Sequence, residues 1–219
     1  MSIVFASRAD AARRLASALH RYRGKNPLVL AIPRGAVEMG RILADALGGE
    51  LDVALVRKLR SPASAEFAVG AIDETGWAYV APYAAHYGAD DAYLEAEKRA
   101  QTETLRKRRA EYTPARPPID AKDRIVIVVD DGLATGATML AALHAARAKG
   151  PARLVCAVPV AAPDSLELVR PHCDDLVCLE APAEFYAVGQ FYREFAQVED
   201  EEVIALLARA PSHPEEKAP

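Results

Sequence analysis

Residues 124–138 have the sequence Arg-Ile-Val-Ile-Val-Val-Asp-Asp-Gly-Leu-Ala-Thr-Gly-Ala-Thr. The five β-branched residues from Ile125 to Val129 predict a strand that is buried on both faces, as in a parallel sheet. Two carboxylates stand where this strand should end, and small residues follow them. Apolar residues at helical spacing come next and predict a helix. The stretch therefore predicts a strand, loop and helix in succession.

The small-residue loop has the composition of a phosphate site. In open parallel sheets, ligands bind beyond the carboxyl ends of the strands. A helix start offers unpaired N–H groups and a positive dipole end, which favour a phosphate. Ala134, Gly136 and Ala137 leave room for backbone amides to approach phosphate oxygens, and Thr135 and Thr138 add hydroxyl donors.

The two acids before the loop suit a different partner. Asp130 and Asp131 would repel a phosphate. Neighbouring carboxylates suit neutral hydroxyls, such as those of a ribose, or a Mg²⁺ ion. An ordinary buried strand with an acidic turn and a capped helix is the alternative interpretation of the same residues.

The order of hydrophobic run, acid pair and small-residue loop resembles the phosphoribosyl pyrophosphate (PRPP) motif of the type I phosphoribosyltransferases. The resemblance implies an α/β fold: a mostly parallel sheet of about five strands with helices on both faces, a β-hairpin lid and a small hood. It implies that the acid pair holds the ribose hydroxyls and that the loop holds the 5′-phosphate. The implied PRPP-binding residues are Gly35, Asp130, Asp131, Gly132, Leu133, Ala134, Thr135, Gly136, Ala137 and Thr138.

Two further motifs match the family in order along the chain. Pro33-Arg34-Gly35 follows a short apolar run, and Arg57-Lys58 follows the predicted strand at residues 51–56. The resemblance implies that Arg34, Arg57 and Lys58 stabilise the departing pyrophosphate, as catalytic residues beside Asp130 and Asp131. A Pro-Gly turn and a solvated strand end are the alternatives. These motifs, with Val188-Gly189-Gln190-Phe191-Tyr192, also resemble a bacterial group of predicted phosphoribosyltransferases.

The chain of 219 residues predicts one domain over residues 1–210, with a core at about 25–180. The lid is expected at about 60–82, with a hairpin over residues 70–80 that turns at 73–76. A C-terminal hood is expected at about 181–210 and a flexible tail at 211–219. Aromatic residues concentrate in the hood, where packing is the main expectation and contact with an acceptor is the alternative: Phe185, Tyr186, Phe191, Tyr192 and Phe195.

The composition of the chain limits the classes of partner that it is expected to bind. The net charge is −4, so no nucleic-acid partner is expected. The basic run at residues 106–109 is interpreted as a solvated helix face because glutamates interleave with it. No apolar run is long enough for a membrane span and no export signal is evident, which predicts a cytoplasmic protein.

The implied reaction transfers the 5-phosphoribosyl group from PRPP to a nitrogen nucleophile, a nucleobase or related amine, with release of pyrophosphate. Mg²⁺ is expected to be held through PRPP rather than by a protein cage, so no metal-ligating residues are predicted. A homodimer is allowed. A non-catalytic PRPP-binding sensor or regulator on the same fold is the alternative. Ala134 stands where enzymes for hypoxanthine and guanine carry an Asp, so these bases are expected to be poor acceptors.

Overall fold

The computed structural model describes residues 4–114 and 117–209. Its centre is a five-stranded sheet in the order β2-β1-β6-β7-β8, and every neighbouring pair is parallel. The predicted parallel sheet of about five strands is confirmed. The strands are β1 (Leu28–Ala31), β2 (Glu50–Val53), β6 (Ile125–Val129), β7 (Arg153–Val160) and β8 (Asp175–Glu180).

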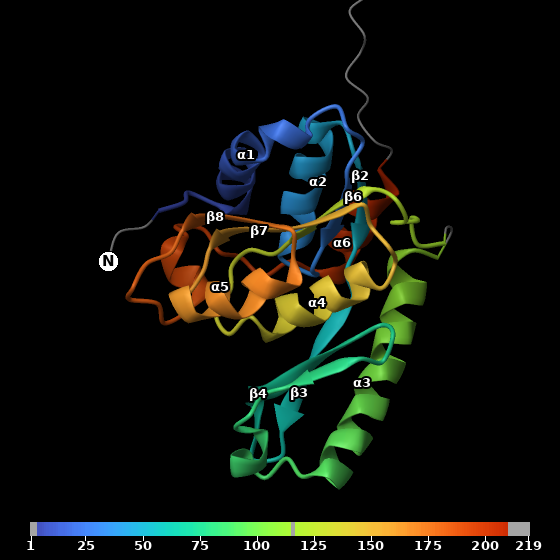
Figure 1. Cartoon of the computed structure of the whole chain (residues 1–219), viewed down its shortest axis with the longest axis vertical. Coiled ribbons are helices and arrows are strands. Elements are labelled where there is room, and N and C mark those ends of the chain that lie inside the picture. Colours follow the sequence, from blue (N-terminus) through green and yellow to red (C-terminus); the bar gives the residue numbers. More distant parts are fainter. Residues whose placement is uncertain (1–3, 115–116, 210–219) are drawn as a thin grey trace, which may run out of the picture.

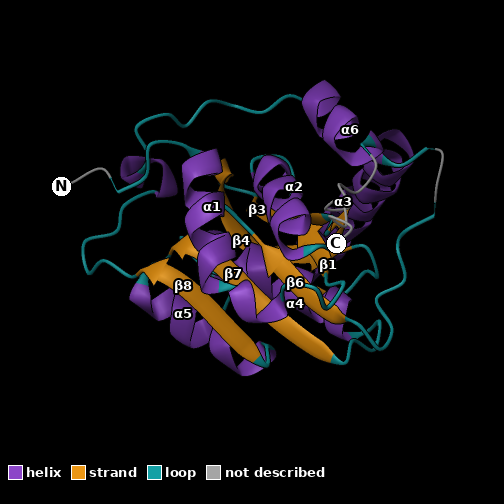
Figure 2. Ribbon diagram, turned by 90° about the horizontal axis from the view of Figure 1, so that it is seen from above, coloured by secondary structure: helices purple, strands orange, loops and turns teal. Residues whose placement is uncertain are grey.

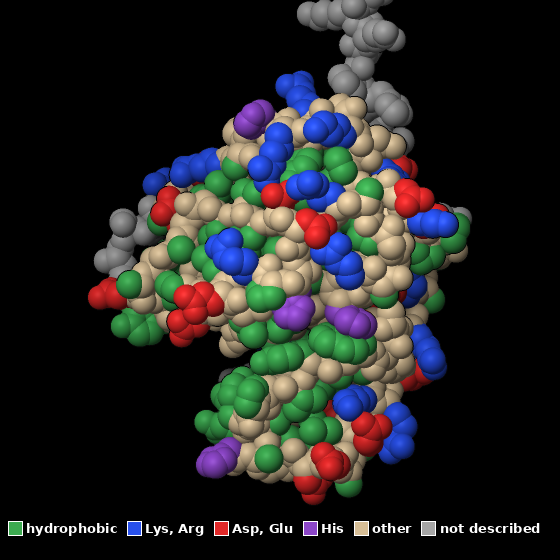
Figure 3. Space-filling view, in the orientation of Figure 1, with side chains coloured by type: hydrophobic (Ala, Val, Ile, Leu, Met, Phe, Trp, Pro, Cys, Tyr) green, Lys and Arg blue, Asp and Glu red, His purple; other side chains and the backbone are tan. Residues whose placement is uncertain are grey.

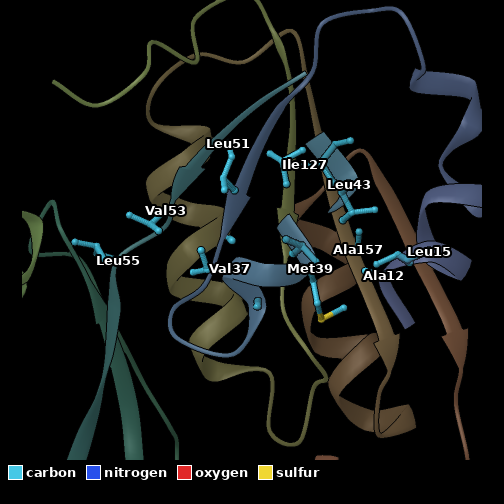
Figure 4. Packing of buried hydrophobic residues seen from close by; sticks show 14 of the residues in the cluster. Ala12, Leu15, Val37, Met39, Leu43, Leu51, Val53, Leu55, Ile127 and Ala157 are labelled. Carbon is cyan, nitrogen blue, oxygen red and sulfur yellow. The ribbon is translucent and has the colours of Figure 1, made fainter. Parts of the chain in front are cut away.

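Helices cover both faces of this sheet (Figure 2). Helices α1 (Arg8–Ala18) and α2 (Ala36–Leu47) pack on one face, and α4 (Ala137–Arg147) and α5 (Pro163–Val169) lie on the other. Alternate residues of each strand serve the two faces. Ile127 packs with the α1 and α2 residues shown in Figure 4, whereas Val126 and Val128 pack against α4. Burial on both faces explains why the central strand consists of β-branched residues alone.

The strand order places two loops side by side. β1 is paired with β2 on one side and with β6 on the other. The chain leaves β1 through α2 towards β2, and it leaves β6 through α4 towards β7, in the opposite direction. Ligands of doubly wound sheets bind at such a switch point, between the two diverging loops. Residues 32–35 and 130–136 therefore border the expected ligand position.

A second body, the arm (residues 56–112), projects from the sheet (Figure 1). Its antiparallel sheet pairs β3 with β4 and β4 with β5. Gly70 lies opposite Val80, which confirms the predicted hairpin. The arm consists of β3 (Val56–Ser61), β4 (Ser64–Asp73), β5 (Ala78–Val80), the 3₁₀ turn η2 (Ala84–Tyr87) and the long helix α3 (Asp91–Tyr112).

The arm corrects the prediction of one core strand over residues 51–56. Strand β2 ends at Val53, and Val56 already begins β3 of the other sheet. Arg57 and Lys58 therefore lie inside an antiparallel strand and not beyond the end of a core strand. Because side chains alternate along a strand, Arg57 turns towards α3 while Lys58 faces outward.

Ionic and aromatic contacts attach the arm to the five-stranded sheet and its covering helices, which together are called the sheet domain below. Arg109 of α3 binds Glu74 in the hairpin turn and the buried Asp52 of β2. His144 of α4 lies 3.0 Å from Asp73 at the same turn and stacks on the ring of Trp77. The predicted solvated face at residues 106–109 is thus wrong for Arg109, because its side chain is largely buried in the contact between the arm and the parallel sheet.

The C-terminal part returns to the sheet domain. Its elements are η4 (Val188–Phe191) and α6 (Asp200–Ala208), and α6 packs beside α2 and α3. A parallel bridge joins Phe5 to Tyr192. The predicted tail at 211–219 lies outside the described residues. Among the helices in the described ranges, none combines the length and apolar character needed to span a bilayer.

Candidate functional site

The acid pair lies at the end of β6, at the switch point of the sheet. Asp130 accepts a hydrogen bond from the backbone N–H of Asp131 at 2.8 Å. Both carboxylates line a cleft of about 360 Å³ together with the loop that follows them. Sequence and structure therefore bring the acids and the small-residue loop into one site.

Asp131 is held by residues from three distant segments. Arg8 Nε donates to Asp131 Oδ2 at 2.8 Å, and the Tyr192 hydroxyl donates to the Asp131 carbonyl at 2.6 Å. A Cβ atom at Gly35 would lie 2.5 Å from Asp131 Oδ2 and 2.9 Å from Arg8 Nε, so a larger residue there would displace this ion pair. Gly35 thus belongs to the site through its closeness to an acid.

Arg8 is a site residue that the sequence prediction missed. Its guanidinium also donates to the carbonyl of Ala196 at 2.6 Å and lies 3.8 Å from the centre of the Phe195 ring. The first helix of the chain and its C-terminal segment therefore meet at the acid pair. Its neighbours in the amphipathic helix include further arginines, so nothing local distinguished Arg8.

Burial and mutual repulsion perturb the two acids. Burial raises the pKa of Asp130 well above its usual range, and the neighbouring charge of Asp131 raises it further, against the opposing charges of Arg8 and Lys58. Burial also raises the pKa of Asp131, against the lowering effect of Arg8. The two carboxylates thus have too little positive charge and too few hydrogen-bond donors around them. Ribose hydroxyls would supply donors, and a hard cation would supply positive charge.

Arg8 should therefore stabilise the fold as well as the acid pair. In Arg8→Gln, the Asp131 carboxylate keeps its burial but loses its cation, and we expect unfolding to become easier by about 2 kcal/mol. Arg14→Gln is the matched control, because Arg14 is half exposed, pairs with Asp10 at the surface and lies 5.3 Å from the centre of the Phe5 ring, so its loss should cost about 1 kcal/mol or less. Urea unfolding measures the free energy of unfolding of both variants. Equal losses would show that the Arg8–Asp131 contact contributes nothing to stability.

The small-residue loop is tied to its neighbours at Leu133 and at the Ala134 carbonyl, which accepts a hydrogen bond from Ser165 Oγ at 2.7 Å. The Leu133 N–H donates to the Val160 carbonyl at 2.9 Å, so that amide is not free for a phosphate, contrary to the predicted role of Leu133. Gly136 has a φ of +77° and precedes α4, and no side chain from the described ranges caps this helix start. The amides from Ala134 onward therefore remain as the candidate anion donors.

A cationic cleft of about 440 Å³ adjoins the first one. Lys58 and Thr138 line both clefts, and Arg57 and Arg60 line the second. The described residues around the second cleft include no carboxylate. Burial lowers the pKa of Arg57, and the charges of Arg108 and Arg60 add to this effect. Arg60, which the prediction omitted, joins the predicted Arg57 and Lys58 in a surplus of positive charge.

Arg34 is placed differently from the other predicted cations. Its guanidinium lies 3.4 Å from Glu199 and 3.7 Å from Asp200, at the start of α6. It lines neither cleft. The structure thus brings Lys58 to the acid pair and its loop and Arg57 to the adjoining cleft, while Arg34 pairs with the C-terminal helix.

The C-terminal aromatic residues mainly pack, as expected. Phe191 and Tyr192 are buried, and Phe185 packs on Phe191. Tyr186 is exposed and does not line the cleft. The aromatic residues that do line the cleft are Phe67 and Tyr83, on the arm, which the sequence prediction had not assigned to the site.

A doubly wound parallel sheet with an acid pair and an open helix start at its switch point has the architecture of the type I phosphoribosyltransferases. Residues 4–195 match the family model of the phosphoribosyl transferase domain, and the chain belongs to this family. The expected family and fold are confirmed.

Known relatives share this assignment. The chain is 41% identical over 208 residues to two proteins from Mycobacterium tuberculosis strains CDC 1551 and H37Rv, each named "Putative phosphoribosyl transferase". The match covers 94% of this chain and 47% of each relative, so the chain spans about half the length of these relatives. The crystal structure of TT1426 from Thermus thermophilus is 46% identical, with a TM-score of 0.78, over 93% of this chain and 97% of that one.

Proposed function

We propose that the chain transfers the 5-phosphoribosyl group of PRPP to a nitrogen nucleophile and releases pyrophosphate. One observation carries the proposal: an acid pair, an uncapped helix start and a carboxylate-free cationic cleft meet at the switch point of the sheet. These three environments suit the ribose hydroxyls, the 5′-phosphate and the pyrophosphate of PRPP. Family membership supports the same reaction class.

The loop and the acids would hold the ribose phosphate. Amides from Ala134 to Thr138, with the hydroxyls of Thr135 and Thr138, would bind the 5′-phosphate at the positive end of α4. Asp130 and Asp131 would accept hydrogen bonds from the 2′ and 3′ hydroxyls. Their charge would also favour the oxocarbenium character that the sugar develops as its bond to pyrophosphate breaks.

The arm strand β3 would serve the leaving group. The bond from C1 of the ribose to the pyrophosphate oxygen breaks, its electron pair leaves with pyrophosphate, and the new bond forms from C1 to the acceptor nitrogen. Lys58, Arg57 and Arg60 line the cleft where that charge would develop. Arg34 could take part only after leaving its partners on α6.

The residues present fit a Mg²⁺ ion that is bound chiefly by the substrate. Within the described ranges, no cluster of three or more His, Cys, Asp or Glu side chains is placed to hold a metal. Two carboxylates at one edge supply the hard oxygen ligands that Mg²⁺ accepts beside water and phosphate oxygens. A bound Mg²⁺ would neutralise charge on the pyrophosphate. Cytoplasmic location and a homodimer stay predictions.

Binding of PRPP is the direct test. At a free concentration one hundred times Kd, PRPP with Mg²⁺ should stabilise the fold by about 2.7 kcal/mol, which is roughly a 5–10 °C rise in Tm for a chain of this size. Ribose alone should change Tm little. Lys58→Ala should weaken the response, whereas Lys98→Ala, which removes only an exposed pair with Glu95, should leave it intact.

The enzyme and the sensor alternatives separate in a second measurement. Pyrophosphate release in the presence of adenine, uracil or a small amine would establish the transferase. A PRPP-dependent Tm rise without release for any acceptor would favour the sensor. A flat melting response at millimolar PRPP with Mg²⁺ would contradict both.

A further inference from the structure

The arm presents an exposed aromatic patch to the acid-pair cleft. Phe67 of β4 is 37% exposed and Tyr83, just before η2, is 41% exposed. Their ring centroids are 5.9 Å apart, and Tyr87 packs on Phe67 at 4.4 Å. Figure 3 shows hydrophobic side chains gathered on the arm beside the notch that separates it from the sheet domain. Contiguous exposed apolar side chains beside a cleft are typical of ligand-binding grooves and interaction sites.

The opposite side of the cleft comes from the sheet domain and is aliphatic. Val188, Leu133 and Met139 line it there. Val188 is held close to the acid loop, because a Cβ atom at Gly132 would lie 2.7 Å from Val188 Cγ1. An aromatic wall, an aliphatic wall and the two acids thus share one cleft of about 360 Å³.

Resting on the proposed function, we infer that Phe67 and Tyr83 form the acceptor platform, and that the acceptor is a planar heteroaromatic ring rather than an aliphatic amine or ammonia. Both residues share a cleft with the acids that would hold the sugar, so a stacked ring would lie beside the reacting carbon. Stacking needs a flat face and suits any base, whereas an aliphatic amine would leave the two rings uncovered.

The arm takes this role because the C-terminal aromatic residues either make other contacts or, like Tyr186, lie outside the cleft. Tyr192 binds the Asp131 carbonyl, and Phe195 stacks on Arg8. Most polar side chains among the described residues that line the cleft are those that the proposed function assigns to PRPP: Lys58, Asp130, Asp131, Thr135 and Thr138. The Tyr83 hydroxyl is then the polar group left beside the edge of a ring, and we expect several heteroaromatic rings to bind with similar affinity.

Ring binding tests the platform independently of turnover. Calorimetry with adenine, uracil and methylammonium, on free protein and on protein saturated with PRPP and Mg²⁺, should show binding of the two rings and not of methylammonium. Phe67→Ala and Tyr83→Ala should each weaken adenine binding roughly 5- to 150-fold and keep the PRPP-dependent rise in Tm. Phe67→Tyr should retain affinity. Tyr186→Ala removes an exposed ring outside the cleft and should change nothing.

The outcomes separate the two proposals. Unchanged adenine affinity in both alanine variants, with the PRPP response intact, would overturn the platform and leave the transferase standing. Ring binding that depends on Phe67 and Tyr83, without any PRPP-dependent rise in Tm, would overturn the transferase and leave the aromatic platform standing. Conversion of a dimer to a monomer by Phe67→Ala in sedimentation, with ring binding kept, would show that the patch contacts a second copy of the chain and would also overturn the platform.

Discussion

The Asp130→Asn variant is expected to lose most PRPP binding while unfolding at a temperature no lower than that of the unmodified protein. Asn keeps the side-chain oxygen that accepts the Asp131 N–H at 2.8 Å. It removes a charge that burial and Asp131 both oppose. The lost hydrogen bonds from ribose hydroxyls to a charged acceptor are worth about 1.5–3 kcal/mol each, so PRPP should bind at least about tenfold more weakly.

The pH dependence of this stability difference has a defined sign. A carboxyl whose pKa is raised in the folded state binds protons more tightly there than in the unfolded chain. Its ionisation therefore costs stability as pH rises from the usual value of 3.8 through the raised value. Asn carries no such cost. The Tm advantage of Asp130→Asn should be largest near neutral pH and should disappear towards pH 3.8.

Two further variants make the comparison specific. Asp131→Asn should also lower PRPP affinity, but its gain in Tm should be smaller than that of Asp130→Asn, because burial raises the pKa of Asp131 against the opposing charge of its ion-pair partner Arg8. Asp120→Asn makes the same charge change at an exposed turn and keeps its contact with the Lys122 N–H, so neither quantity should move. Melting curves with and without PRPP give both readouts. Retained PRPP affinity with a lowered Tm in Asp130→Asn would show that the acid is structural.

Arg109→Leu is expected to destabilise the fold by about 3–5 kcal/mol. Arg109 donates to both carboxylate oxygens of Glu74, at 2.7 and 2.6 Å, to Asp52 at 3.2 Å and to the Val53 carbonyl at 3.0 Å. Asp52 is only 1% exposed and would lose the Arg109 guanidinium while keeping the backbone N–H groups of Val53 and Ile119 as donors. The arm would also lose its main ionic contact with β2.

The same basic run supplies the control for this experiment. Arg106 lies one turn away with its side chain 76% exposed, so Arg106→Leu should change the free energy of unfolding by about 0.5 kcal/mol or less. Replacing Asp52 by Asn in the Arg109→Leu background removes the buried carboxylate that Arg109 contacted and should recover part of the loss. Urea unfolding compares the variants. Similar losses of unfolding free energy for Arg109→Leu and Arg106→Leu would mean that the buried Arg109 contact does not stabilise the packing of the arm on the parallel sheet.

Contacts inside one short stretch were predictable because they depend on neighbouring residues. A run of five β-branched residues has apolar side chains on both faces of a strand, so both faces must be buried. The acids and small residues come directly after this run, and their position beyond the strand end follows from the sequence. The local pattern therefore predicted β6, its loop and α4, and with them the parallel sheet and the family. The hairpin at residues 70–80 was predictable for the same reason, since its turn residues are adjacent in the chain.

Contacts between distant segments were decided by the tertiary structure. Arg8 and Asp131 are 123 positions apart, and no residue near Arg8 indicates that the first helix will pack beside the end of β6. Packing between distant segments also decided three other features. These are the division of residues 51–61 between two sheets, the ion-pair partners of Arg109, and the aromatic wall formed by Phe67 and Tyr83. Hydrophobic patterning specifies which face of an element is buried, but not which charged or aromatic residue of another element will meet it there. The sequence alone therefore determined the sheet and the acid loop, whereas packing of the arm and the two terminal segments decided what surrounds them.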